Sequence, residues 1–220
     1  VTLRRPLPYR LGFEYIERHL READRPRYSL CAVELRLPAP LTFEGFADFN
    51  AGYQQLLGAW DLLLDDLNPV ARTNIAPAVA PPGEPSLYAF AYTVPSSAST
   101  MPTFVVAGAG DLSDQADLSP SAIVRPGETS TAALQEKATT VMQVMQERII
   151  GLGLSWDDAT RINIYTAMDI HPYLVDVVLD RVDGAACHGV HWHYSRPPIR
   201  GLVYEMDLRG VRKEYIDGTK

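Results

Sequence analysis

The sequence predicts a soluble α/β protein in which helices cover a sheet. Two segments, 42–68 and 129–151, carry apolar side chains at intervals of three and four residues, which is the period of an amphipathic helix. Short segments rich in Val, Ile, Tyr and Phe lie around them and are bounded by Pro and Gly, as is typical of strands. Because a wide apolar helix face must be buried, the simplest arrangement packs both helices on a sheet.

Composition and charge narrow the class of protein. With 220 residues, 46% of them hydrophobic, the chain can bury the core of one large domain or two small ones. A net charge of −7 without a basic block argues against nucleic-acid binding, which needs a cationic surface. No apolar run reaches the roughly 20 residues of a membrane helix, and none follows Val1–Pro6 as in a secretory signal.

The first half, residues 1–100, is expected to form one helix-covered unit. Its predicted elements are a helix at 11–20, a strand at 28–37, the helix after Thr42, and strands at 70–75 and 87–94. Thr42 supplies the side-chain oxygen of a helix N-cap, and Pro69 stops that helix. The Ser/Pro-rich joint at 95–100 is too short for a free linker, so we expect a surface loop there.

The second half, residues 101–220, repeats the alternation of strand and helix. Its predicted elements are a strand at 103–107, a long helix capped by Thr129 or Ser130, a strand at 161–165, a shorter helix at 171–182, and strands at 190–194 and 202–208. Gly151 and Gly153 end the long helix, whose methionines we interpret as core. Two pseudo-repeated halves are one interpretation of this organisation, although no residue-by-residue repeat is visible.

The order of motifs over about residues 101–213 resembles the RidA/YjgF superfamily. The strand 104–108, the long helix and the strand 161–165 are followed by Asp169-Ile170-His171-Pro172-Tyr173 and Leu202-Val203-Tyr204-Glu205-Met206-Asp207. The resemblance implies a chorismate-mutase-like α/β sheet packed on helices. It also implies a homotrimer with clefts between subunits, and hydrolysis of imines and enamines to ketones and ammonia without a cofactor.

The site residues that this resemblance implies transfer unevenly. The glutamate of the superfamily falls on Glu205, which we therefore expect to be catalytic. The arginine that binds the substrate carboxylate falls at or beside Gly189, where the nearest polar neighbour is His188. The asparagine of the superfamily turn falls on His171, and its serine before the first glycine falls on Ala107. These departures argue against general 2-imino-acid activity.

A second resemblance covers the whole chain. An N-terminal extension with the segment Asn68-Pro69-Val70-Ala71-Arg72-Thr73-Asn74 is similar to that of 2-aminomuconate deaminases. This resemblance implies a deaminase that hydrolyses an enamine or imine of a small unsaturated acid, 2-aminomuconate or a chlorinated analogue, to the 2-oxo acid and ammonia.

Such a reaction requires a proton-transferring group and cations for the carboxylates. A carboxylate such as Glu205 can act as general base toward a water molecule and then as acid toward the leaving nitrogen. Arginine binds carboxylates with its planar fork, and Arg72 is the first candidate because its segment has few apolar positions. Arg196 and Arg200 are the next candidates.

The histidines at 188–193 form the most unusual local cluster. His191 and His193 lie two apart on a predicted strand, so both project to one face, whereas His188 lies on the other. A metal would need a further ligand, and we favour the interpretation in which His188 is catalytic and His191 and His193 line the substrate cleft. Cys187 is disfavoured as a nucleophile because adjacent strand residues, here His188, face opposite ways.

Alternatives from other classes remain at this point. The chain could be a non-catalytic small-ligand-binding or regulatory trimer, or a metal-dependent hydrolase built on the histidine strand. No cofactor is predicted, since Gly108-Ala109-Gly110-Asp111 lacks the third glycine of a dinucleotide fingerprint. Two cysteines are too few for a disulfide framework, so we expect a cytoplasmic location and leave a pairing of Cys31 with Cys187 open.

Overall fold

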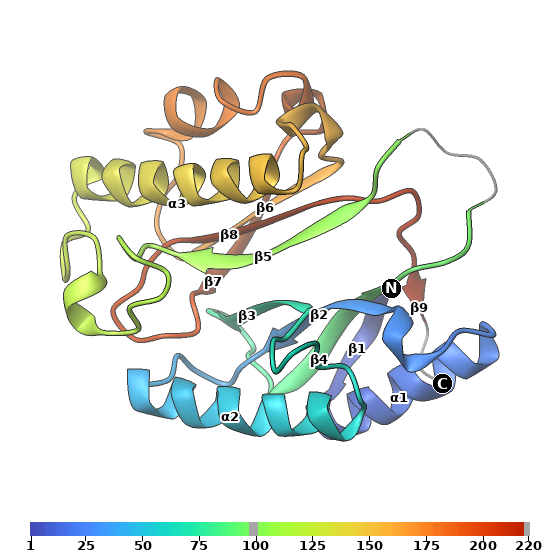
Figure 1. The fold of residues 1–220 in the computed structure, drawn as a ribbon. Helices are drawn as coiled ribbons and strands as arrows, with labels where there is room; N and C mark the ends of the chain where they lie inside the picture. Colours follow the sequence, from blue (N-terminus) through green and yellow to red (C-terminus); the bar gives the residue numbers. More distant parts are fainter. Residues whose placement is uncertain (97–100, 218–220) are drawn as a thin grey trace.

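The protein folds as a mixed α/β structure around a nine-stranded sheet, as a computed structural model shows for residues 1–96 and 101–217 (Figure 1). Most of the loop predicted at 95–100 lies outside these residues. The strands are β1 Thr2–Pro8, β2 Leu30–Arg36, β3 Ala71–Pro77, β4 Ser86–Tyr92, β5 Phe104–Gly110, β6 Arg161–Thr166, β7 His191–Arg196, β8 Glu205–Gly210 and β9 Ile216–Asp217. The helices are α1 Tyr9–Glu22, α2 Phe43–Ala59 and α3 Thr131–Gly151, with a π-helical segment Leu174–Leu179 and 3-10 segments Arg27–Ser29, Pro120–Ala122, Trp156–Asp158 and Asp183–His188.

The two halves of the chain have the same strand topology. In the first half, β4 pairs antiparallel with β1 and β2, and β2 pairs parallel with β3. In the second half, β8 pairs antiparallel with β5 and β6, and β6 pairs parallel with β7. The strand order within each half is therefore first, fourth, second, third. The two halves join between β3 and β7, where Ala76 pairs with Arg196 and Pro77 with Ser195, and again where β9 pairs with β1.

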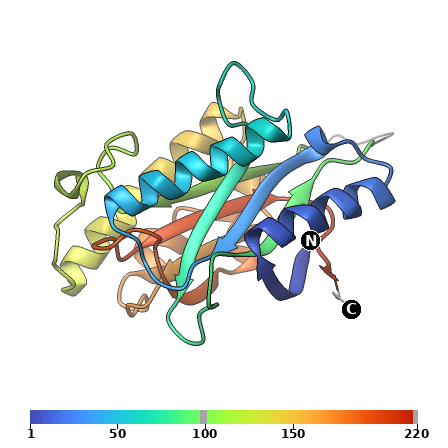
Figure 2. The same ribbon diagram turned by 90° about the horizontal axis from the view of Figure 1, so that it is seen from below.

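The helices lie on the outside and the strands in the middle. Figure 1 shows α3 above the strands of the second half, and α1 and α2 below those of the first half. From below, α1 and α2 follow one another across the same face (Figure 2). The first and last strands, β1 and β9, lie side by side, because Thr2 pairs with Ile216 in parallel. No helix in the described ranges is long and apolar enough to cross a membrane.

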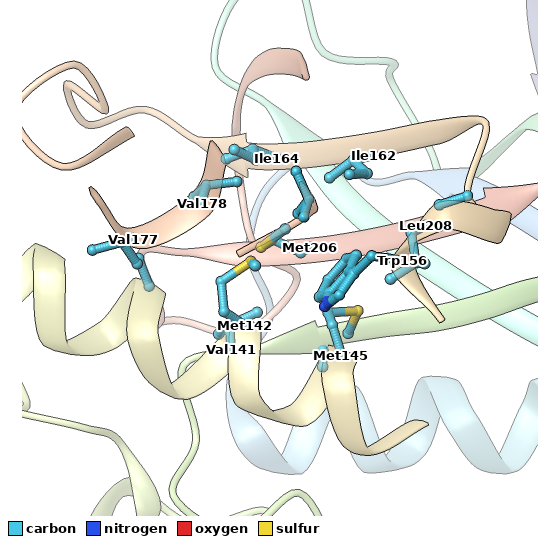
Figure 3. Packing of buried hydrophobic residues seen from close by; sticks show 14 of the residues in the cluster. Val141, Met142, Met145, Trp156, Ile162, Ile164, Val177, Val178, Met206 and Leu208 are labelled. Atoms are coloured by element: carbon cyan, nitrogen blue, oxygen red, sulfur yellow. The ribbon is translucent and has the colours of Figure 1, made fainter. Parts of the chain in front are cut away.

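The core of the second half lies between α3 and its strands. Ser130 caps α3 by accepting a hydrogen bond from the N–H of Ala133, as one of the two predicted caps. Met142 and Met145 pack against Ile164 and Met206, which confirms their interpretation as core (Figure 3). Each buried side chain of this size contributes roughly 1.5–3 kcal/mol by leaving water, so this face fixes α3 on the sheet.

The layer between the two halves is polar. Because strand side chains alternate, β8 directs Met206 toward α3 and Glu205, Asp207 and Arg209 toward the first half. An Nη of Arg209 lies 2.8 Å from Oε1 of Glu34 on β2, and both side chains are largely buried. Charged groups therefore meet in this layer, where two sheet faces would ordinarily pack through apolar side chains. Such a layer can accommodate a polar active site.

The helix predicted from Thr42 to residue 68 is shorter than expected. Its N-cap is confirmed, since the Thr42 hydroxyl accepts from the N–H of Gly45, but α2 ends at Ala59. The next residues include Asp61, Asp65 and Asp66, which have φ of 58°, 48° and 63° and cannot continue a right-handed helix. The apolar stripe therefore extends past the helix, and its last members, Leu64 and Leu67, are 66% and 71% exposed.

Three further expectations need correction. The helix predicted at 171–182 is reduced to Leu174–Leu179, and the strand predicted from residue 202 begins at Glu205. Two strands at one end of the sheet, β1 and the edge strand β9, were not predicted. β1 carries two arginines and two prolines in seven residues, and β9 has only two residues, so neither has the alternating apolar pattern of a strand.

Candidate active site

A cleft of about 510 Å³ lies between the two halves of the chain. Its size suits a small molecule. It is lined by Asn50, Tyr53 and Gln54 of α2, by Asn68, Pro69, Val70, Ala71 and Arg72 at the start of β3, by Val105, Val106 and Ala107 of β5, and by Arg148, Gly151 and Leu152 at the end of α3. Both halves of the chain are therefore needed to form it.

Arg72 is a half-buried cation on the wall of this cleft. The guanidinium carbon lies 4.6 Å from the ring centre of Tyr53, 5.7 Å from that of Phe46 and 5.8 Å from that of Phe49. An Nη donates a hydrogen bond to Oδ1 of Asn50. Burial lowers the pKa of Arg72. Among residues 1–96 and 101–217, no carboxylate forms an ion pair with it, so its charge is held in a desolvated setting that favours an incoming anion.

Arg148 supplies a second cation from α3. Its Nη1 donates to the carbonyl oxygens of Ala107, at 2.8 Å, and Gly108, at 3.3 Å. These carbonyls belong to a bulge, since Val106 pairs with Leu208 whereas Ala109 pairs with Met206, which leaves one extra residue on β5. Burial lowers the pKa of Arg148, and the described chain offers it no carboxylate ion-pair partner either.

Glu205 lies behind the bulge, at the start of β8. Its side chain is only 4% exposed. A Cβ atom on Gly108 would come within 2.3 Å of Oε1 of Glu205 and 3.1 Å of Cγ2 of Thr73, so glycine is required at this position for the carboxyl to fit. Glu205 itself does not line the cleft, but it lies beside Gly108 and Thr73, which follow the lining residues Ala107 and Arg72 in the chain.

The electrostatic setting of Glu205 favours its neutral form. Burial is the main cause that raises its pKa well above the usual range, and the negative charges of Asp207 and Asp111 add to it. The positive charges of Arg72 and Arg148 oppose the rise. A carboxyl group in this setting holds a proton that it can donate, and the two arginines that line the cleft are close enough to influence it.

Two of the predicted site histidines lie on β7. The ring of His193 stacks on that of Tyr165 at 4.8 Å between centroids, and its Nε2 lies 3.2 Å from Oδ1 of Asn163. Burial lowers the pKa of His193 to about 4, so its ring is neutral near pH 7. His191 is exposed, with its Nδ1 3.2 Å from an Nη of Arg161.

The remaining predicted residues also lie away from the cleft. His188 is exposed at the end of a 3-10 segment, and Arg196 is exposed at the end of β7. His171 is exposed, with Nδ1 2.7 Å from Oδ1 of Asp169. β3 connects the two regions, because Arg72 stands near its beginning whereas β7 joins it at its end. The structure therefore brings Arg72 together with Glu205, but not the histidines or Arg196.

Sequence reasoning missed Arg148 as a site residue. The last turn of a helix commonly carries an arginine, because the positive charge favours the helix C-terminus, so nothing in the local pattern distinguishes it. Cys31 and Cys187 are both free thiols, so the pairing left open is absent. In the described ranges, no three His, Cys, Asp or Glu side chains gather as metal ligands would.

Comparison with known proteins places the whole arrangement in one family. Residues 1–215 match the family model described as 2-aminomuconate deaminase CnbZ. The chain is 42% identical over 217 residues to 2-amino-5-chloromuconate deaminase of Comamonas testosteroni, which covers 98% of this chain and 86% of that protein. Both matches extend through the first half, so they include Arg72 and α2 as well as Arg148 and Glu205. The chain thus belongs to the 2-aminomuconate deaminase CnbZ family.

Proposed function

We propose that the protein hydrolyses 2-aminomuconate or 2-amino-5-chloromuconate to the corresponding 2-oxo acid and ammonia, using only its own side chains. Membership of its family makes it a deaminase of 2-aminomuconate-type substrates. The observation that carries the assignment of the site is the pair of partly buried guanidinium groups, Arg72 and Arg148, that line one cleft without a carboxylate partner in the described chain. Muconates carry two carboxylates, and the cleft offers one cation to each.

Binding places the two ends of the substrate on different halves of the protein. Arg72 binds one carboxylate from β3, and Arg148 binds the other from α3. The ring of Tyr53 lines the same cleft and provides an apolar surface for the conjugated carbon chain. This arrangement leaves the amino-bearing end of the substrate close to the bulge at Gly108, behind which Glu205 lies.

The first chemical step is proton transfer from Glu205. The neutral carboxyl donates its proton to the enamine carbon, whose C=C electron pair forms the new C–H bond while the nitrogen lone pair forms C=N. The products of this step are an iminium ion and the Glu205 carboxylate. The sequence suggested a general base as the starting form, whereas burial of the side chain favours the acid.

Water addition and loss of ammonia restore the starting state. The water oxygen attacks the iminium carbon while the Glu205 carboxylate takes a proton from the same water molecule. This step gives a carbinolamine and neutral Glu205. Glu205 then protonates the nitrogen, the C–N bond breaks to release ammonia, and the resulting protonated carbonyl returns its proton to the carboxylate. One water is consumed, and one ketone and one ammonia are formed.

We further propose that residues 1–100 and 101–220 are two related chorismate-mutase-like units, the first being a degenerate copy of the second. Their identical strand orders support this proposal. The cleft between subunits that the superfamily implies would then have its counterpart between the two halves. The homotrimer remains part of the proposal, and sedimentation equilibrium of the wild-type protein tests it through a mass three times that of the chain.

An ammonia-release assay tests the reaction itself. Enzymatically generated 2-aminomuconate is added to wild type and to Glu205→Gln, and both ammonia and the loss of ultraviolet absorbance are followed. We expect release by wild type and a loss of about 10²- to 10⁴-fold in kcat for the variant, because glutamine cannot transfer the proton. Ligand binding should persist in the variant. Wild-type release no faster than the spontaneous rate, or full activity of the variant, would favour a ligand-binding protein instead.

A further inference from the structure

Asp111 and Lys137 form a buried ion pair that the reaction above does not use. Nζ of Lys137, on α3, lies 2.8 Å from Oδ2 of Asp111, which directly follows β5. Both side chains are almost completely excluded from solvent. Lys137 also donates a hydrogen bond to the carbonyl oxygen of Val124. Replacing such a pair by apolar side chains is often neutral or stabilising, so stability alone gives little reason for it.

The second oxygen of Asp111 holds the backbone that leads into Glu205. Oδ1 accepts hydrogen bonds from the N–H groups of Val203, at 3.0 Å, and Tyr204, at 3.2 Å. The N–H of Asp111 in turn donates to the carbonyl oxygen of Tyr204, at 3.1 Å. Since β8 begins only at Glu205, these bonds take the place of a strand ladder just before the catalytic carboxyl.

We propose that the Asp111–Lys137 pair positions the catalytic carboxyl of Glu205. Lys137 anchors Asp111 from α3, and Asp111 anchors the two amides that precede Glu205. The proposal rests on the proposed function, because it assigns the pair a role in the proton transfers of that same site. Asp111 and Lys137 touch neither the cleft nor the reacting atoms, so they act through Glu205.

The pair also contributes charge to the surroundings of Glu205. The charged groups that act on this carboxyl are Asp207 on the same strand, Asp111 after β5, Arg72 on β3 and Arg148 on α3. Asp111 raises the pKa of Glu205. Because the ammonium of Lys137 lies 2.8 Å from Oδ2 of Asp111 and carries the opposite charge, we expect it to oppose that effect. The two members of the pair therefore influence the proton affinity of Glu205 in opposite directions.

Opposite pH shifts distinguish positioning from a purely structural role. The reaction starts from neutral Glu205, so kcat/KM falls as pH rises through the pKa of Glu205. This fall is the alkaline limb of the pH profile. Asp111→Asn removes a negative charge and should move this alkaline limb to lower pH. Lys137→Met removes a positive charge and should move it to higher pH. The double variant, whose pair is again neutral overall, should return the limb toward wild type.

We expect the two single variants to lose activity mainly in kcat. Displacement of a reacting group by about 1 Å costs on the order of 10²-fold, so a fall of 10- to 100-fold is expected for Asp111→Asn. KM should change much less, because Arg72 and Arg148 are untouched. Leu134→Ala is the matched control. It removes a buried apolar side chain of α3 one turn from Lys137, and should lower Tm without moving the pH limb.

The possible failures are separable. Absence of ammonia release by wild type contradicts the proposed function. An active wild type whose folded single variants keep its kcat and alkaline limb overturns the positioning role, as does an equal shift of the limb in Leu134→Ala. If a single variant does not fold, the charge-free double variant decides: wild-type kcat contradicts the proposal, and a kcat at least tenfold lower at unchanged KM supports it.

Discussion

The polar layer between the two halves has two regions that differ in how their polar groups are paired. The cleft side contains Arg72 and Arg148, and the β7 side contains Asp207 and Glu34 with their partners. On the β7 side, Asp207 accepts from Tyr165 at 2.9 Å and from Asn163 at 2.6 Å, and Glu34 pairs with Arg36 and Arg209. On the cleft side, the guanidinium groups of Arg72 and Arg148 are half-buried and have no carboxylate partner in the described chain. The carboxylates of Asp207 and Glu34 thus have partners within the chain, whereas in our proposal the two cleft arginines find theirs in a dianionic ligand.

The cluster of polar residues on β7 did not indicate where the cleft lies. The histidines of β7 stand out in the sequence, yet His193 already has a ring partner and a hydrogen-bond partner. Arg72 and Arg148 are 76 positions apart and have no local signature. The proposed function depends on charge left unpaired after folding, which only the assembled structure reveals.

The largest expected effect that tests the comparison is at Arg72. Arg72→Ala should lower kcat/KM by about 10²- to 10³-fold, chiefly through KM, because truncating one partner of a buried charge pair costs 2–5 kcal/mol. Arg72→Lys keeps the charge but loses the planar fork, so we expect an intermediate loss. Arg196→Ala, on the β7 side, is the control and should retain near-wild-type kinetics. If Arg196→Ala lowered kcat/KM more than Arg72→Ala, the substrate site would lie on the β7 side and not in the cleft.

Gly108 tests the distance between the cleft wall and Glu205. Gly108→Ala places a methyl group 2.3 Å from the position of Oε1, so either the carboxyl or the bulge must move. A loss of about 10- to 100-fold in kcat is expected. Gly52→Ala on α2 is the matched control, since its added methyl group meets nothing within 4 Å and alanine favours the helix. Equal kcat values for Gly108→Ala and Gly52→Ala would contradict a catalytic role of Glu205.

Arg148 is expected to show a smaller effect than Arg72, because part of its hydrogen-bonding capacity is used by the bulge carbonyls. Arg148→Met should raise KM for a dicarboxylate by about tenfold, in keeping with the loss of one charge-assisted hydrogen bond. Inhibition constants of mono- and dicarboxylates sharpen the test. Wild type should prefer the dicarboxylate, and the variant should lose that preference. A retained preference would place the second carboxylate elsewhere.

Most of the fold was predictable, whereas the site was predictable only in part. Thr42 and Ser130 correctly indicated where their helices start, because a hydroxyl oxygen before an apolar stripe typically accepts a hydrogen bond from a backbone N–H of the first helical turn. Resemblance indicated Glu205 as catalytic and segment composition indicated Arg72 as a carboxylate-binding residue, and both roles stay predictions. Arg148, the bulge at Gly108 and the Asp111–Lys137 pair were not predicted, because each depends on contacts between residues far apart in the chain.

The smallest effect on activity is expected at His193, and its measurable consequence is in stability. Burial lowers its pKa from 6.5 to about 4, so the unfolded chain binds this proton more readily than the folded one. The contribution to folding stability is therefore full above pH 6.5 and is lost as pH falls toward 4. His193→Gln should flatten the dependence of Tm on pH in this window while leaving kcat/KM at neutral pH within about threefold, as for a residue outside the catalytic site. A large loss of kcat in a variant with wild-type Tm would instead show that His193 takes part in catalysis. The β7 side would then belong to the active site as well.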